Sequence, residues 1–258
     1  MLLRADSSAI APGNTIAPAL RIVSLVPSQT ELLFDLGLGN QVVGVTKFCI
    51  YPAAARQTAS VIGGTKDFKF EKIAALKPDL IIGNKEENYR AGIEQLAVRF
   101  PVWISDISNL DDALQMIRQV GQLTGTRQLA EGLADEIFQS FAALTWAKPA
   151  QTAAYFIWRK PFMVAAAGTF IDDMLGRAGF TNVFENLERY PEITAEQLAF
   201  AAPQRIFLSS EPYPFKEKNV AEMREICPLA QIEIIDGELF SWYGSRLRYS
   251  AEYFKHLH

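Results

Sequence analysis

Residues 21–40 read RIVSLVPSQTELLFDLGLGN, and this stretch decides the fold class. The apolar run at residues 22–26 is short and rich in Val and Ile, which predicts a buried strand. The run leads into the pattern Ser28-Gln-Thr-Glu31, which predicts a capping box at the start of a helix. The leucines within residues 32–36 give that helix an apolar face. A strand followed at once by a helix is the repeating unit of an α/β protein.

The same alternation continues along the chain. Further strands are expected at residues 42–46, 80–83, 102–105, 154–158, 163–166, 206–209 and 232–236. Helices are expected at residues 110–123, 171–178, 195–200 and 220–226. Because strand–helix alternation implies parallel strands covered by helices, the sequence predicts an α/β fold with two Rossmann-like lobes and mainly parallel sheets.

A long helical segment separates the two series of strands. Apolar residues recur every three or four positions within residues 127–147, and Pro149 ends the segment. At 1.5 Å per residue such a helix spans roughly 30 Å, about the width of a small domain. We therefore expect an N-terminal tail at residues 1–20, a lobe at 21–125, a connecting helix at 126–148 and a second lobe at 149–258. A single rigid helix predicts limited closure of the lobes over a ligand cleft between them.

Bulk composition excludes several classes of protein. The chain has 258 residues, is 49% hydrophobic and carries a formal net charge of −4, so bulk charge does not attract nucleic acid. No apolar run is long enough to span a bilayer, and the first twenty residues lack the apolar core of a secretory signal. Cys49 and Cys227 are expected to be free, buried thiols. His256 and His258 are expected to lie in a frayed tail.

Motifs for catalysis are absent from the sequence. It contains no phosphate-binding glycine loop, no nucleophile elbow and no Cys-x-x-Cys pair. Both histidines lie at the C-terminal end, so neither a Ser–His–Asp triad nor a His-rich metal site is expected in the body of the chain. We therefore expect no catalytic residues, no metal ligands and no cofactor of the protein's own.

Aromatic and basic side chains instead gather near the ends of the expected strands, where open α/β sheets bind their ligands. Aromatic faces can hold flat apolar rings, and arginines can hold carboxylates or phosphates. Packing in the core of a lobe is the alternative for each aromatic. The candidates for ligand binding are Tyr51, Trp158, Arg159, Phe162, Tyr190, Trp242, Tyr243 and Arg246.

Several blocks resemble the substrate-binding proteins that serve ABC importers of iron chelates and vitamin B12. They are RIVSLVPSQTE at residues 21–31, VGVT at 43–46 followed by Tyr51-Pro52, FEKI at 70–73, and ALKPDLI at 75–81. The similarity continues more weakly to WYGSRL at residues 242–247. The resemblance implies two α/β lobes joined by one long helix, with the ligand between them.

The resemblance also implies roles for individual residues. Glu71 and Glu196 match two docking carboxylates, one on each lobe, that meet arginines on the permease. Tyr51, Phe162, Tyr190 and Trp242 match positions that line the ligand in the cobalamin-binding branch. Thr65 and Asn84 depart from that branch, which has tryptophans at these positions. Both docking acids fall in the first turn of expected helices, with Thr194 as the expected N-cap of the second.

The sequence thus predicts a periplasmic or extracytoplasmic binding component, expected to be monomeric, that delivers cobalamin or another corrinoid, a ferric siderophore or haem to an ABC permease. Arg159 and Arg246 would suit an anionic ligand. A two-lobed α/β enzyme of reductase or metallocluster type is the alternative, and turnover would reveal it. A receptor for bare metal ions is a second alternative, which would need clustered His, Asp or Glu ligands.

Overall fold

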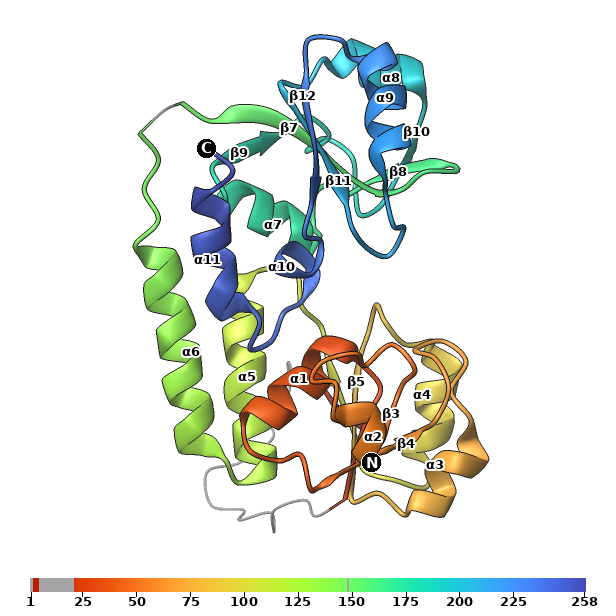
Figure 1. Ribbon diagram of the computed structural model, residues 1–258. Helices are drawn as coiled ribbons and strands as arrows, with labels where there is room; N and C mark the ends of the chain where they lie inside the picture. The colour runs from red at the N-terminus through yellow and green to blue at the C-terminus, as the bar shows by residue number, and fades with distance from the viewer. Residues whose placement is uncertain (1, 5–20, 148) are drawn as a thin grey trace. The chain divides into compact units, whose positions relative to one another are not determined.

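A computed structural model describes residues 2–4, 21–147 and 149–258. The chain divides into two compact units. The first unit comprises Met1–Ile107, Asp111–Phe138 and Tyr243–Arg246, and the second comprises Ser108–Leu110, Gln139–Trp242 and Leu247–His258. The chain is therefore mixed α/β with one sheet in each unit, as the sequence predicts (Figure 1).

The first unit is built on a six-stranded sheet whose strands are all parallel, in the order β1-β6-β5-β2-β3-β4. Its strands are β1 (Leu2–Arg4), β2 (Ile22–Ser24), β3 (Val42–Val45), β4 (Ser60–Val61), β5 (Leu80–Asn84) and β6 (Val102–Ser105). Its helices are α1 (Pro27–Asp35), α2 (Ala55–Thr58), α3 (Phe70–Leu76), α4 (Arg90–Ala97) and most of α5 (Leu110–Thr124) and α6 (Arg127–Ala142).

The order of these strands places a topological switch point between β2 and β5. The chain leaves β2 toward β3 on one side and later returns to β5 on the other. Ligands of open α/β sheets bind beyond the carboxyl ends of the strands at such a point. In the first unit those ends lead into α1 after β2 and into the turn that begins at Lys85 after β5.

The second unit has a mixed sheet. β7 (Gln151–Trp158), β11 (Arg205–Ser209) and β12 (Gln231–Ile235) run parallel, and β9 (Phe180–Asn182) also pairs parallel with β7. β8 (Phe162–Val164) is antiparallel both to β7 and to β10 (Glu192–Ile193). Its helices are α7 (Phe170–Arg177), α8 (Ala195–Ala201), α9 (Glu217–Ile226), α10 (Glu238–Ser241) and α11 (Leu247–Lys255).

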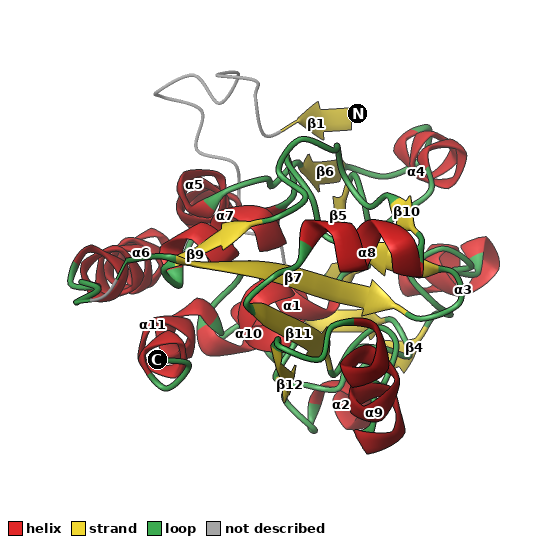
Figure 2. Cartoon of the chain, turned by 90° about the horizontal axis from the view of Figure 1, so that it is seen from above, coloured by secondary structure: helices red, strands yellow, loops and turns green. Residues whose placement is uncertain are grey.

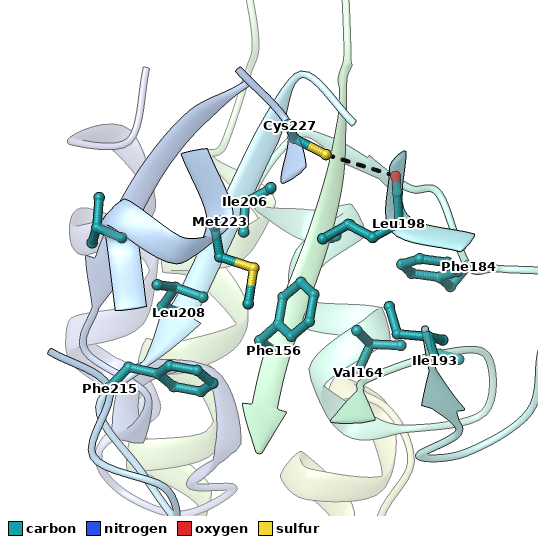
Figure 3. Close-up of a cluster of buried hydrophobic side chains, with 13 residues drawn as sticks. Phe156, Val164, Phe184, Ile193, Leu198, Ile206, Leu208, Phe215, Met223 and Cys227 are labelled. Atoms are coloured by element: carbon teal, nitrogen blue, oxygen red, sulfur yellow. Dashed lines mark hydrogen bonds between the residues drawn. The ribbon is translucent and has the colours of Figure 1, made fainter. Parts of the chain in front are cut away.

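One face of the second sheet is covered by α8 and α9. Phe156, Ile206 and Leu208 from the strands pack with Leu198 of α8 and Met223 of α9 in one buried cluster (Figure 3). The Cys227 thiol, just after α9, donates a hydrogen bond to the Leu198 carbonyl at 3.7 Å. This contact holds the C-terminal end of α9 beside α8.

The long helix is shorter than predicted. α6 ends at Ala142, whereas the sequence suggested a helix to Ala147, and Lys148 lies outside the described residues. Within the first unit α6 lies beside α5 (Figures 1 and 2), and Arg118 of α5 pairs with Asp135 of α6 at 2.8 Å. α6 runs through the division between the units at Phe138 and Gln139, and the chain crosses that division again on either side of Tyr243–Arg246.

Two local predictions at the chain ends also need revision. The expected tail of residues 1–20 lies outside the described residues except for Leu2–Arg4, which form an edge strand against β6. His258 does not fray: its ring stacks on Phe180 at 4.8 Å and lies 4.3 Å from the Trp146 ring. A ring nitrogen of His258 also lies 2.7 Å from the Ala178 carbonyl oxygen. Apolar contact and this hydrogen bond give the last residue partners that spacing alone could not indicate.

Candidate functional site

The start of α1 differs from the predicted capping box. The helix begins at Pro27, and its N-cap residue, Val26, makes no side-chain hydrogen bond to the helix. Pro suits this first position because its missing N–H would have no partner there. Both carboxylate oxygens of Glu31 accept hydrogen bonds from Arg246.

In the first unit Arg246, Glu31 and Tyr51 form one group. Arg246 donates through Nε at 2.9 Å and through a terminal nitrogen at 2.6 Å, a two-point pair with Glu31. The centre of its guanidinium also lies 4.0 Å from the centroid of the Tyr51 ring. Both members of the pair are 13% exposed as side chains, which makes this a strongly desolvated ion pair.

The segment that carries Arg246 fits closely against α1. A Cβ atom on Gly244 would lie 2.7 Å from the backbone oxygen of Ser28, so only glycine allows this approach. Ser245 and Tyr243 are buried on either side of this glycine. The segment is thereby fixed to the first unit, and Arg246 is held over Tyr51. Tyr243 is among the predicted ligand residues, but its side chain is almost wholly covered.

In the second unit Trp158 and Arg159 follow each other at the end of β7. Trp158 is 39% exposed as a residue, and its indole N–H donates to the Lys160 carbonyl at 3.1 Å. Its ring meets the Tyr213 ring edge-on at 5.5 Å. Arg159 makes a two-point pair with Glu222 of α9, at 2.7 Å and 2.9 Å. The hydrogen bond to Glu222 raises the pKa of Arg159 above its ordinary value. Arg159 therefore remains charged and already has a carboxylate partner.

The other aromatics of the second unit have mixed surroundings. Phe162, at the start of β8, is half-buried and meets Phe156 edge-on at 5.8 Å, which favours a packing role. Tyr190 is half-buried, and the Arg189 guanidinium lies 5.7 Å from its ring centroid. Trp242 is buried and donates its indole N–H to Glu211 at 3.0 Å. Glu211 also accepts a hydrogen bond from Ser241, so it fixes the residues at the end of α10.

The two predicted docking carboxylates both lie in first turns of helices, as expected. Glu71 is exposed in α3, and Glu196 is exposed in α8. Thr194 is the N-cap of α8, as predicted, and forms a capping box with Gln197. The Glu196 carboxylate accepts a hydrogen bond from the Thr194 hydroxyl and another from the backbone N–H of Glu196, and these bonds hold its pKa below the usual value. Glu196 is therefore ionised at neutral pH.

The departures from the cobalamin-binding branch have distinct surroundings. Asn84 is buried at the end of β5, where its amide donates to Ser105 and its carbonyl accepts from the backbone of Glu86 and Glu87. Asn84 therefore orders the turn after β5. Its side chain is buried, unlike an aromatic ring that is exposed to a ligand. Thr65 is half-buried, and its backbone carbonyl accepts a hydrogen bond from Asn88 at 2.9 Å.

Sequence reasoning missed the acidic partner of each arginine. Glu31 is 215 residues from Arg246 and Glu222 is 63 residues from Arg159, so no local pattern could join them. Among the described residues no cluster of three or more His, Cys, Asp or Glu side chains could hold a metal ion. Cys49 and Cys227 are free and buried, as predicted. None of the described helices combines the length and apolar character of a membrane span.

Known proteins resemble the chain over most of its length. Residues 22–226 match the family described as periplasmic binding protein. A vitamin B12-binding protein of Pectobacterium carotovorum is 29% identical over 239 residues, covering 90% of this chain and 86% of that protein. A vitamin B12-binding protein of Vibrio cholerae is 31% identical over 200 residues, covering 74% of this chain and 71% of that protein.

Solved structures agree on the fold. The periplasmic vitamin B12 binding protein of Vibrio cholerae superposes with a TM-score of 0.77 at 24% identity, covering 92% of this chain and 95% of that one. A periplasmic haem-binding protein from Pseudomonas aeruginosa superposes with a TM-score of 0.79 at 23% identity, covering 93% and 92%. Because the family match spans well over half of the sequence, the chain belongs to the periplasmic binding protein family.

Proposed function

We propose that this chain is the solute-binding component of an ABC importer and that its ligand is cobalamin or a closely related corrinoid. The observation that carries the proposal is its similarity, over 90% and 74% of the chain, to proteins described as vitamin B12-binding. In this role the protein captures and delivers its ligand, and it catalyses no reaction. It acts outside the cytoplasmic membrane as a monomer.

Partly exposed aromatic rings support a large, flat ligand. Tyr51 in the first unit and Trp158 in the second are each 39% exposed while one edge or face is held by a neighbour. Such rings present rigid apolar area at little cost in conformational entropy. We propose that both units contribute side chains to one ligand.

Both arginines are already paired with glutamates, which favours an uncharged ligand over one that carries several carboxylates. Arg246 and Arg159 each hold a glutamate in a two-point pair, so neither pair has a net charge. A haem propionate or a carboxylate siderophore would have to compete with Glu31 or Glu222 for the guanidinium. Cobalamin carries peripheral amides instead, which can bond to the edges of such pairs without displacing them.

A thermal-shift panel of cobalamin, cobinamide, haem and several ferric siderophores tests this proposal. At a concentration about 100 times Kd, cobalamin should raise the free energy of unfolding by about 2.7 kcal/mol. Haem or a siderophore that stabilises the protein more than both corrinoids would contradict the ligand assignment. Turnover of a bound substrate would contradict the assignment as a binding protein.

Delivery to the permease is proposed to use Glu71 and Glu196 as a two-point electrostatic contact. Both are exposed carboxylates in first turns of helices, one in each unit. Charged groups placed in this way steer encounter and set orientation. Replacing both with lysine should abolish uptake and leave cobalamin binding intact. Undiminished uptake by the double variant would contradict this docking role.

A further inference from the structure

The two most exposed large apolar side chains among the described residues lie in the second unit. Phe200, in the last turn of α8, is 94% exposed, and Leu229, in the turn after α9, is 99% exposed. Single exposed apolar side chains are common on protein surfaces. Phe200 and Leu229 differ from isolated cases in their positions relative to each other and to Glu196.

The ends of α8 and α9 bring the two side chains onto adjoining segments. Leu198 precedes Phe200 by two residues, and Cys227 precedes Leu229 by two. The Cys227 sulfur lies 3.7 Å from the Leu198 carbonyl oxygen (Figure 3). Just beyond, Gln231 donates its backbone N–H to the Gln204 carbonyl at 2.9 Å, which joins the starts of β11 and β12. Phe200 and Leu229 therefore lie on segments that meet at this end of the sheet.

Glu196 belongs to the same region. It precedes Phe200 by four residues in α8, and residues at that spacing are neighbours on one helix face. Leu198, between them in sequence, turns to the buried cluster, so the outer face of α8 carries both the carboxylate and the phenyl ring. We call Glu196, Phe200 and Leu229 the α8 patch.

We propose that the α8 patch is a docking surface for the permease, on which an apolar contact through Phe200 and Leu229 accompanies the ionic contact of Glu196. The inference rests on the proposed function. The fitting partner surface has a basic side chain beside an apolar pocket. A second copy of this chain fits poorly, because a two-fold contact through the patch would bring Glu196 close to its own copy. An anionic lipid surface would likewise be repelled by the carboxylate.

The first unit offers a contrast that makes the proposal specific. Glu71 lies in the first turn of α3, and the residue four positions later is Ala75. Glu71 thus lacks the large apolar side chain that Phe200 places four residues after Glu196. Salt screens exposed charges but not apolar contact. Binding through the α8 patch should therefore be the more salt-resistant half of the interface.

The test uses the full chain and a bacterial vitamin B12 permease–ATPase complex. The complex is reconstituted in lipid nanodiscs. Binding is measured at low and high salt for Phe200→Ser, Leu229→Ser and the double variant. Phe200→Leu is the conservative variant. Val98→Ser is the matched control, because Val98 is 84% exposed in the first unit. Cobalamin affinity and thermal stability are measured in parallel.

Phe200→Ser should weaken binding to the permease about tenfold at both salt concentrations, and the double variant should weaken it further. Phe200→Leu should retain most of the affinity, and Val98→Ser should match the wild type. Cobalamin affinity and stability should not change. Glu71→Gln should instead reduce the dependence of binding on salt.

Wild-type permease binding by the double variant would overturn the inference and leave the proposed function standing. So would changes confined to self-association or to binding of anionic vesicles. If the wild-type chain binds neither cobalamin nor the permease, the proposed function and this inference both fail.

Discussion

Each unit contains an arginine–glutamate pair of the same two-point geometry, yet the pairs differ in burial and in their neighbours. Arg246 and Glu31 are 13% exposed, and Arg246 lies over the Tyr51 ring. Arg159 and Glu222 are 23% and 29% exposed. The first pair joins residues from opposite ends of the sequence, and the second joins a strand end to α9. The same kind of ion pair thus holds a segment that is distant in sequence against the first unit, whereas in the second unit it joins the end of β7 to α9 nearer the surface.

The largest expected effect comes from breaking the more buried pair. Glu31→Ala leaves the Arg246 guanidinium desolvated and without its carboxylate, which should cost about 3 kcal/mol of stability. Urea unfolding followed by circular dichroism measures the loss. A loss no greater than that of Glu222→Ala would contradict the difference in burial. Glu31→Ala combined with Arg246→Met should recover part of the stability, since no unpaired charge then remains.

Alkaline pH should affect stability through the second unit. Tyr155 is fully buried and donates to Ser209 at 3.2 Å, and burial raises the pKa of Tyr155 well above its usual value. The unfolded chain releases this proton near pH 10 and the folded chain keeps it, so stability falls as pH rises beyond that point. The slope is at most about 1.4 kcal/mol per pH unit. Tyr155→Phe should flatten this part of the curve, and an unchanged slope would show that other groups cause it.

The more exposed pair should matter less. Glu222→Gln keeps one acceptor for Arg159 and removes a charge that solvent already screens, so about 1 kcal/mol or less should be lost. Thermal unfolding at two salt concentrations checks the size of the loss. A loss as large as that of Glu31→Ala would remove the distinction between the units. Cobalamin affinity of this variant also shows whether the Glu222 charge affects binding of the ligand.

The smallest effects concern the cysteines, one in each unit. Burial raises the pKa of both thiols. Cys49 is wholly buried, and its sulfur contacts the hydroxyls of Thr30 and Thr46. Because the thiolate is the reactive form, both should react with a disulfide reagent far more slowly at pH 8 than in the unfolded chain. Cys49 should be the slower of the two. Single Cys→Ser variants assign the rates, and equal fast labelling would contradict the burial of both sites.

Sequence patterns predicted regular elements where burial is periodic or continuous. β6 at Val102–Ser105 has its predicted bounds, and α8 begins at its predicted residue because Thr194 caps it. The strands that were missed, such as β4 at Ser60–Val61 and β10 at Glu192–Ile193, are too short to carry a pattern. Tertiary pairing alone makes them strands.

The site was less predictable than the fold, since its contacts join distant positions. The Ser28–Glu31 pattern predicted a local capping box, but Pro27 starts α1 and Arg246 supplies a stronger partner for Glu31. The sequence placed Phe200 at the end of an expected helix but did not indicate which way it faces; in the structure Leu198 is buried and Phe200 is exposed. Residue type suggested candidate side chains, but it could not indicate that Arg159 and Arg246 already pair with carboxylates.

The proposed function requires side chains from both units to bind the same ligand, and one set of titrations tests this directly. Cobalamin affinity is measured by calorimetry for the wild type, Tyr51→Ala, Trp158→Ala and the double variant. Tyr249→Ala serves as the control, because this tyrosine is 57% exposed. We predict that Tyr51→Ala and Trp158→Ala each weaken binding about tenfold, that their combination weakens it further, and that the control binds as the wild type. Wild-type affinity in either single variant would contradict a ligand shared between the units.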